Sequence, residues 1–254
     1  MTPRHVLLFL VPILLLYELG LLILLTSADG SAVEDIRARR LLALVFQLFG
    51  APGLTLAPLL ALAVLAIQHL VRRDPLFVRL RVLPLMALES LAWALPLFVL
   101  GQLVYSLFAG VAAPPQGPPV TAALQPLAAA APQLAAAAEP AWLPLARDVV
   151  RAAGAGIYEE LVFRLAGITL IHLLLADVLR LNTKTAAAVA LGATSLAFAF
   201  YHDLTPAGAP FDFPLLAFYT FAGLYFGIAF ITRGFGVAVG LHFAYDLLAF
   251  SSQA

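Results

Sequence analysis

The sequence GIYEELVFR, residues 156–164, places three charged side chains, Glu159, Glu160 and Arg164, inside an apolar run of membrane-helix length. A charge at the centre of a bilayer costs from about 2.5 kcal/mol on insertion scales to roughly 10 kcal/mol or more in simulations. Three such residues together indicate either an ion pair that neutralises itself between helices or a reactive site. The stretch alone leaves both interpretations open.

The composition is that of an integral membrane protein. Of the 254 residues, 63% are hydrophobic and 11% are charged, and the mean hydropathy is +1.00, whereas a soluble domain has about 25% charged residues. The zero net charge gives no indication of a nucleic-acid partner, and the lack of cysteine excludes thiol catalysis and cysteine-ligated metal. All but one of the 14 basic residues are arginine, a bias that suggests a high-GC bacterial genome and hence an inner-membrane, multi-pass protein.

The apolar segments predict an all-α fold, a polytopic membrane helix bundle with seven to eight transmembrane helices. The polar stretch 26–40 is expected to be a loop, and the second segment is interrupted by glycine and proline, which predicts a kink. The predicted apolar segments are 6–25, 41–71, 82–109, 142–176, 184–203, 213–232 and 235–251.

We expect three regions along the chain. Residues 1–110 would hold the N-terminal transmembrane helices, and residues 142–254 a catalytic helical core. Between them, residues 111–141 are rich in alanine and proline; paired prolines cannot continue a helix, so this stretch is expected to be a linker. No internal repeat is visible, which disfavours a proton-coupled transporter built from inverted repeats.

Helical geometry assigns different roles to the two glutamates. Residues four apart share a helix face, so Glu160 can pair with Arg164, and this pairing lowers the cost of burying both. Glu159 points elsewhere and has no such partner. A carboxylate in apolar surroundings is suited to general acid or base chemistry near neutral pH. We therefore expect Glu160 and Arg164 to be structural and Glu159 to be reactive.

Two further polar pairs occur in apolar segments. Phe198 and His202 are four residues apart at the end of one segment, and His242 and Asp246 are four apart on one face of the last. Taken alone, His202 would be a hydrogen-bonded residue at the interface, and His242 and Asp246 a pair that satisfies itself. Together with the glutamate cluster, these costly residues favour one shared functional site.

The three motifs Glu-Glu-xxx-Arg, Phe-xxx-His and His-xxx-Asp occur in this order within residues 142–251. They resemble the CAAX protease and bacteriocin-processing family of intramembrane proteases, also called the Abi or type II CAAX prenyl endopeptidase family. The resemblance implies that Glu159 and His202 activate a water molecule that attacks a peptide carbonyl, and that His242 and Asp246 stabilise the oxyanion.

The implied partners are membrane lipid and a peptide or membrane-protein substrate. Because bacteria generally lack prenylated CAAX proteins, another membrane substrate or a small peptide is favoured over prenyl-protein maturation. The sequence leaves the oligomeric state open.

One residue departs from the family pattern, because the third motif commonly ends in asparagine and here ends in Asp246. An ionised carboxylate repels an oxyanion, so Asp246 would have to donate while protonated, orient His242 or help to bind a metal. Glu159, His202 and His242 form a set compatible with Zn²⁺, and a metal-free mechanism is equally compatible. The change to aspartate weakly favours an alternative, a non-proteolytic membrane immunity or assembly protein that retains the fold.

Overall fold

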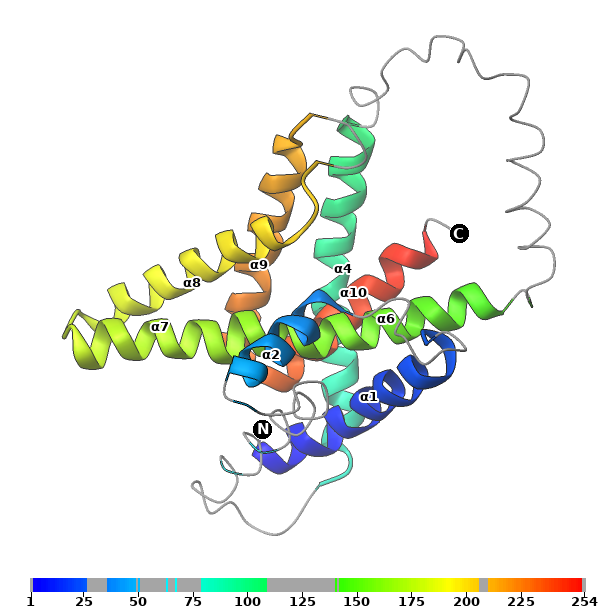
Figure 1. Ribbon diagram of the computed structural model, residues 1–254, viewed down its shortest axis with the longest axis horizontal. Helices are drawn as coiled ribbons and strands as arrows, with labels where there is room; N and C mark the ends of the chain where they lie inside the picture. Colours follow the sequence, from blue (N-terminus) through cyan, green and yellow to red (C-terminus); the bar gives the residue numbers. More distant parts are fainter. Residues whose placement is uncertain are drawn as a thin grey trace.

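The protein is described here by a computed structural model. It covers residues 2–26, 36–48, 79–108, 142–205 and 210–252, together with residues 50, 63, 67 and 140. The regular elements are helices, which confirms the predicted all-α membrane bundle (Figure 1). They are α1 Pro3–Leu24, α2 Arg37–Leu48, α4 Val82–Phe108, α6 Leu143–Glu159, the π-helix η1 Glu160–Ile168, α7 Thr169–Leu173, the π-helix η2 Leu174–Val178, α8 Thr183–Tyr201, α9 Phe213–Arg233 and α10 Phe235–Ser251.

Within the described residues, five helices are long and apolar enough to cross a membrane. They are Pro3–Leu24, Val82–Val104, Leu143–Val178, Thr183–Tyr201 and Phe213–Arg233, and α10 is a shorter apolar helix. Their outward faces carry leucine and isoleucine side chains such as Leu22 and Ile23, as expected for surfaces that contact lipid. The linker predicted at 111–141 and the kink predicted within 41–71 lie outside the described residues.

The expectation of a loop throughout 26–40 is wrong at its end, because α2 already begins at Arg37. Tertiary contacts fix this first turn. The Arg39 guanidinium pairs with Glu18 of α1 at 3.2 Å, and Ala38 is fully buried. Glu18 also accepts a hydrogen bond from the Tyr158 hydroxyl of α6, so it faces the bundle. The polar composition of residues 26–40 gave no indication of these contacts.

Helices α6, η1, α7 and η2 form one continuous rod, Leu143–Val178, that runs across the whole molecule (Figure 1). Its 36 residues correspond to about 54 Å at 1.5 Å per residue, well beyond the hydrocarbon thickness of about 30 Å. The rod changes from α to π geometry between Glu159 and Glu160. Single π-turns inside α-helices frequently mark functional sites.

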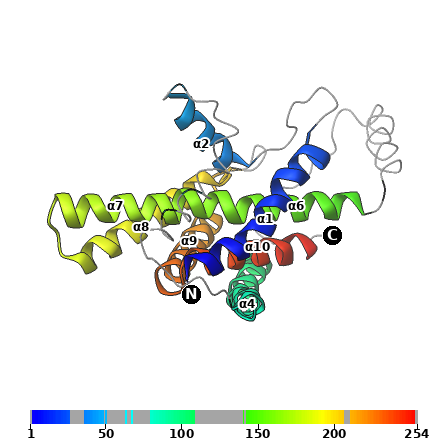
Figure 2. The ribbon, with the colours of Figure 1, turned by 90° about the horizontal axis from the view of Figure 1, so that it is seen from below.

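The other helices surround the middle of this rod. Helix α10 packs on α4, α6 and α9, while α8 packs on α9 and η1, and α1 packs on α6. One apolar cluster fills the space between α1, α6 and α10, and a second joins α4, η1, α8, α9 and α10. Viewed from below, α2 lies on one side of the rod and α4 on the other (Figure 2). Val162 of η1 packs against both clusters, so they meet at η1.

Small residues and a tight turn set the position of α10. A Cβ atom added to Gly156 would lie 3.0 Å from the carbonyl oxygen of Val239 and 3.1 Å from the amide nitrogen of Phe243. The backbones of α6 and α10 thus approach closely, one turn before the two glutamates. Gly234 turns the chain between α9 and α10 with φ of +91°, a conformation that favours glycine.

We predict that Gly156→Val destabilises the bundle by about 1–3 kcal/mol, since the added methyl groups would push α10 away from α6. Gly192→Ala is the matched control, because nothing lies within 4 Å of its added Cβ and α8 would gain helix propensity. The measurement is reversible denaturation of both variants in detergent. Equal stability of Gly156→Val and the native chain would contradict the close α6–α10 contact.

Candidate active site

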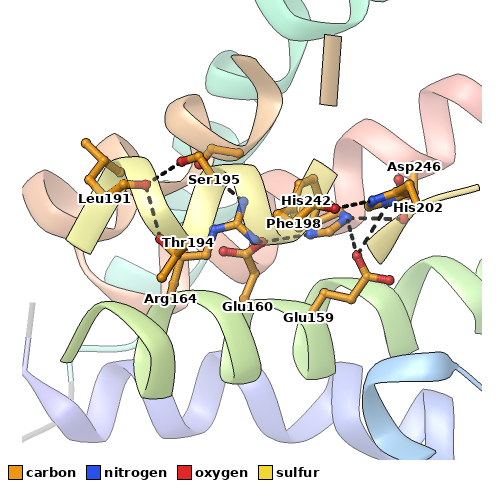
Figure 3. Close-up of polar contacts among 11 residues, drawn as sticks. Glu159, Glu160, Arg164, Leu191, Thr194, Ser195, Phe198, His202, His242 and Asp246 are labelled. Carbon is orange, nitrogen blue, oxygen red and sulfur yellow. Dashed lines mark hydrogen bonds and ion pairs between the residues drawn. The ribbon is translucent and has the colours of Figure 1, made fainter. Parts of the chain in front are cut away.

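The structure brings all the predicted site residues together (Figure 3). Glu159 ends α6, Glu160 and Arg164 belong to η1, His202 directly follows α8, and His242 and Asp246 come from α10. Three separate stretches, the middle of the rod, the end of α8 and α10, therefore contribute to one cluster, and each supplies one of the three motifs.

The Glu159 carboxylate faces two imidazole rings. Its Oε2 atom lies 4.0 Å from Nε2 of His202 and 3.9 Å from Nε2 of His242. These separations exceed a direct hydrogen bond. Oε2 is buried and has no hydrogen-bond partner among the described residues. Burying a carboxylate oxygen in this way is costly, so the arrangement is suited to a third group that bridges the carboxylate and the rings.

Glu160 and Arg164 form the predicted ion pair, with Oε1 and Nη1 separated by 3.1 Å and both side chains almost wholly buried. The Arg164 Nη2 group also donates to the carbonyl oxygen of Gly223 in α9 at 3.3 Å. The pair therefore ties η1 to α9 as well as balancing its own charge. Its predicted structural role agrees with this geometry.

Glu160 has a second contact that the helical spacing does not reveal. Its Oε1 atom accepts a hydrogen bond from Nδ1 of His242 at 2.8 Å. A carboxylate only accepts, so the proton of the ring lies on Nδ1, and Nε2 is the atom turned toward Glu159. Glu160 thus orients one of the two rings that face the reactive carboxylate.

His202 is oriented in the same way by a different acceptor. Its Nδ1 lies 2.7 Å from the carbonyl oxygen of Phe198, one turn earlier in α8. A carbonyl oxygen also only accepts, so Nε2 of His202 is again free to face Glu159. His202 lies just beyond the spanning segment of α8, and burial lowers its pKa to about 4, so the ring is neutral at pH 7.

Aromatic rings enclose this polar cluster. The Phe198 ring lies 4.3 Å from the Arg164 guanidinium carbon and contacts the His202 ring edge-on. Phe226 stacks on His242 with ring centres 4.5 Å apart, and Tyr219 stacks on His202 at 3.9 Å. Phe198 follows from its motif, whereas the motifs contain no signal for Phe226 or Tyr219, which come from α9.

Asp246 approaches the same histidine. Its Oδ2 atom lies 3.7 Å from Nε2 of His242, one helical turn away, and its side chain is half-buried. Nε2 of His242 therefore has Glu159 on one side and Asp246 on the other, both beyond direct hydrogen-bond distance. A group that approached Nε2 of His242 would therefore also approach Asp246.

These side chains stand further apart than the ligands of a zinc ion. Two oxygen or nitrogen ligands of a tetrahedral zinc site, each about 2.0–2.2 Å from the metal, stand roughly 3.3–3.6 Å apart. The carboxylate-to-imidazole separations are 3.9 and 4.0 Å. Among the described residues, no group of three or more histidine, aspartate or glutamate side chains is arranged to hold a metal ion. The zinc interpretation therefore stays a prediction.

A comparison with known families matches the part of the chain that contains these motifs. Residues 141–248 match the family model of the type II CAAX prenyl endopeptidases, described as Rce1-like. The match and the five long apolar helices indicate a multi-pass membrane protein whose region 141–248 is similar to the CAAX-type endopeptidases.

The Rce1-like region contains every residue of the cluster, whereas α1, α2 and α4 precede it. Searches of the curated proteins and of the solved structures found no match. The roles of single residues therefore depend on the geometry described above.

We predict that Arg164→Met destabilises the protein by about 3–5 kcal/mol, because it leaves the Glu160 carboxylate buried without its cation. Arg233→Met is the matched control. Its pair with Glu89 is partly exposed to solvent, so its loss should destabilise the protein far less than the loss of the buried pair. Denaturation in detergent compares the two, and an equal loss would contradict a structural role for the buried pair.

Proposed function

We propose that the protein is an intramembrane endopeptidase that hydrolyses a peptide bond of a membrane-associated substrate with a water molecule activated by Glu159. The single observation that carries this proposal is the buried Oε2 atom of Glu159, which faces two imidazole nitrogens without bonding to either. One water about 2.8 Å from each polar atom would bridge separations of this size.

In the proposed reaction, Glu159 takes a proton from this water while Nε2 of His202 accepts its other hydrogen in a hydrogen bond and so orients it. The water oxygen then attacks the carbonyl carbon of the substrate, and a new carbon–oxygen bond forms. Glu159 finally delivers the proton to the leaving nitrogen as the carbon–nitrogen bond breaks. Every step uses groups that already lie around one point.

His242 is the proposed donor to the oxyanion. Its Nδ1 is held by Glu160, and the ring, once protonated, presents an Nε2–H group on the side of Glu159. Asp246 lies close to this atom, and we propose that it helps to orient the ring rather than donating to the substrate.

Replacement of the reactive carboxylate tests the proposal. We predict that Glu159→Gln lowers kcat by at least about 100-fold, because an amide cannot take a proton from water. The melting temperature should stay near the native value, since the Oε2 atom of Glu159 has no direct hydrogen-bond partner among the described residues and glutamine keeps the size of the side chain. The control is Glu89→Gln, which alters a partly exposed carboxylate paired with Arg233.

Cleavage is measured in proteoliposomes by mass spectrometry, with prenylated CAAX peptides and single-span membrane peptides as probes. Cleavage by Glu159→Gln at the native rate would show that another group activates the water. His202→Ala and His242→Ala are assayed in parallel and are also expected to lose activity.

The metal-free form of this mechanism predicts that 1,10-phenanthroline and EDTA leave the rate of peptide cleavage unchanged. The physical reason is that the carboxylate and the two rings stand further apart than zinc ligands. Elemental analysis of the purified protein should find far less than one zinc per chain. Zinc in a one-to-one ratio, lost together with activity on chelation, would instead establish the metal-dependent alternative.

A further inference from the structure

Tyr201 connects the proposed active site with a helix outside the Rce1-like region. It is the last residue of α8 and directly precedes His202. Its ring packs edge-on against Phe163, with centres 5.2 Å apart, and against His202 at 5.3 Å. The ring is therefore fixed by neighbours on both sides, and its hydroxyl has little freedom to move.

The first turn of α2 binds Tyr201 at two points. The backbone N–H of Ala38 donates to the Tyr201 hydroxyl at 2.8 Å, and the Arg37 guanidinium donates to the Tyr201 carbonyl oxygen at 3.2 Å. The first four N–H groups of a helix have no partner within it. Tyr201 supplies one such partner and so caps α2, although it lies more than 160 residues further along the chain.

These contacts determine where the hydroxyl proton can go. The N–H of Ala38 occupies a lone pair of the oxygen, so the O–H bond remains available for donation. The two rings that Tyr201 contacts both lie beside Glu159: Phe163 follows it by four residues in the rod, and Nε2 of His202 is 4.0 Å from its Oε2 atom. Catalytic hydrogen bonds are often long before substrate binds and shorten in the complex. The Glu159 carboxylate is the acceptor to which the Tyr201 hydroxyl would donate.

We propose that Tyr201 is a positioning residue for Glu159: its hydroxyl, held by the first turn of α2, donates to the carboxylate and keeps Oε2 turned toward the two histidines. The inference depends on the proposed function, since it names a further residue of the same site. It also gives α2 a role, because the helix outside the Rce1-like region fixes a donor inside it.

Tyr201→Phe tests this role while it retains the ring that packs on Phe163 and His202. We expect kcat to fall about tenfold, the size expected for one hydrogen bond to a charged group, with KM unchanged and the melting temperature somewhat lowered, because the N–H of Ala38 loses its acceptor. Tyr225→Phe is the matched control, because it removes a hydroxyl that donates to the carbonyl oxygen of Trp93. Equal kcat values in the two tyrosine variants would mean that the Tyr201 hydroxyl only caps α2, and would overturn the proposal.

A second pair of variants tests whether α2 keeps Tyr201 in position. Arg37→Met should lower kcat, whereas Arg40→Met, the same change one turn along α2, should not. Arg37 acts through Tyr201, so adding Arg37→Met to Tyr201→Phe should lower kcat no further. Equal effects of the two arginine variants, or additive losses in the double variant, would contradict the coupling through Tyr201.

The infrared band of the Glu159 carboxyl group, assigned by its loss in Glu159→Gln, provides a readout without substrate. Removing the Tyr201 hydroxyl should shift this band, and removing that of Tyr225 should not. If the native protein cleaves none of the probes, the proposed function is refuted. The infrared band would still show whether the Tyr201 hydroxyl contacts the Glu159 carboxyl group. An unchanged band in Tyr201→Phe would overturn the inference even in an active enzyme.

Discussion

The site depends on the buried carboxylate of Glu160. One of its oxygens pairs with the Arg164 guanidinium and also accepts from Nδ1 of His242. Removing one partner of such a buried pair costs about 3–5 kcal/mol, because the other charge stays buried alone. The same carboxylate therefore stabilises the bundle and selects the ring nitrogen that faces Glu159. Stability and chemistry are coupled through one residue, which explains why a membrane helix retains three charges.

The change from α to π geometry lies at the junction between the two glutamates, since α6 ends at Glu159 and η1 begins at Glu160. Adjacent residues on a helix already point in different directions. Here the Glu159 side chain turns toward the two histidine rings and the Glu160 side chain toward Arg164 and His242. Two chemically identical side chains thus receive different surroundings, and it is Glu159 whose buried, unbonded Oε2 faces the Nε2 atoms of both histidines. A functional role is common for π-turns of this kind.

Sequence patterns were sufficient for the parts of the structure that depend on local spacing. Apolar runs predicted α4, α8, α9 and α10 within a few residues, and the four-residue spacing predicted the pair of Glu160 and Arg164. Contacts between distant segments were not readable. The start of α2 depends on Glu18 and Tyr201, and the orientation of His242 depends on Glu160, 82 residues earlier. These contacts are tertiary, and no periodicity along the chain encodes them.

The phenylalanine of the Phe-xxx-His motif contributes to the site through its side-chain ring rather than through its backbone. The hydrogen bond from His202 goes to the backbone carbonyl of residue 198, and any residue could supply that oxygen. The ring of Phe198, however, lies over the Arg164 guanidinium and contacts both histidine rings. Phe226 and Phe163 lie near the same guanidinium at 5.2 and 5.9 Å. A desolvated cation–π contact is worth about 2 kcal/mol, so these rings offset part of the cost of burying Arg164. An aliphatic side chain at residue 198 would keep the hydrogen bond and lose this compensation, so the motif specifies an aromatic residue because of Arg164 rather than because of His202.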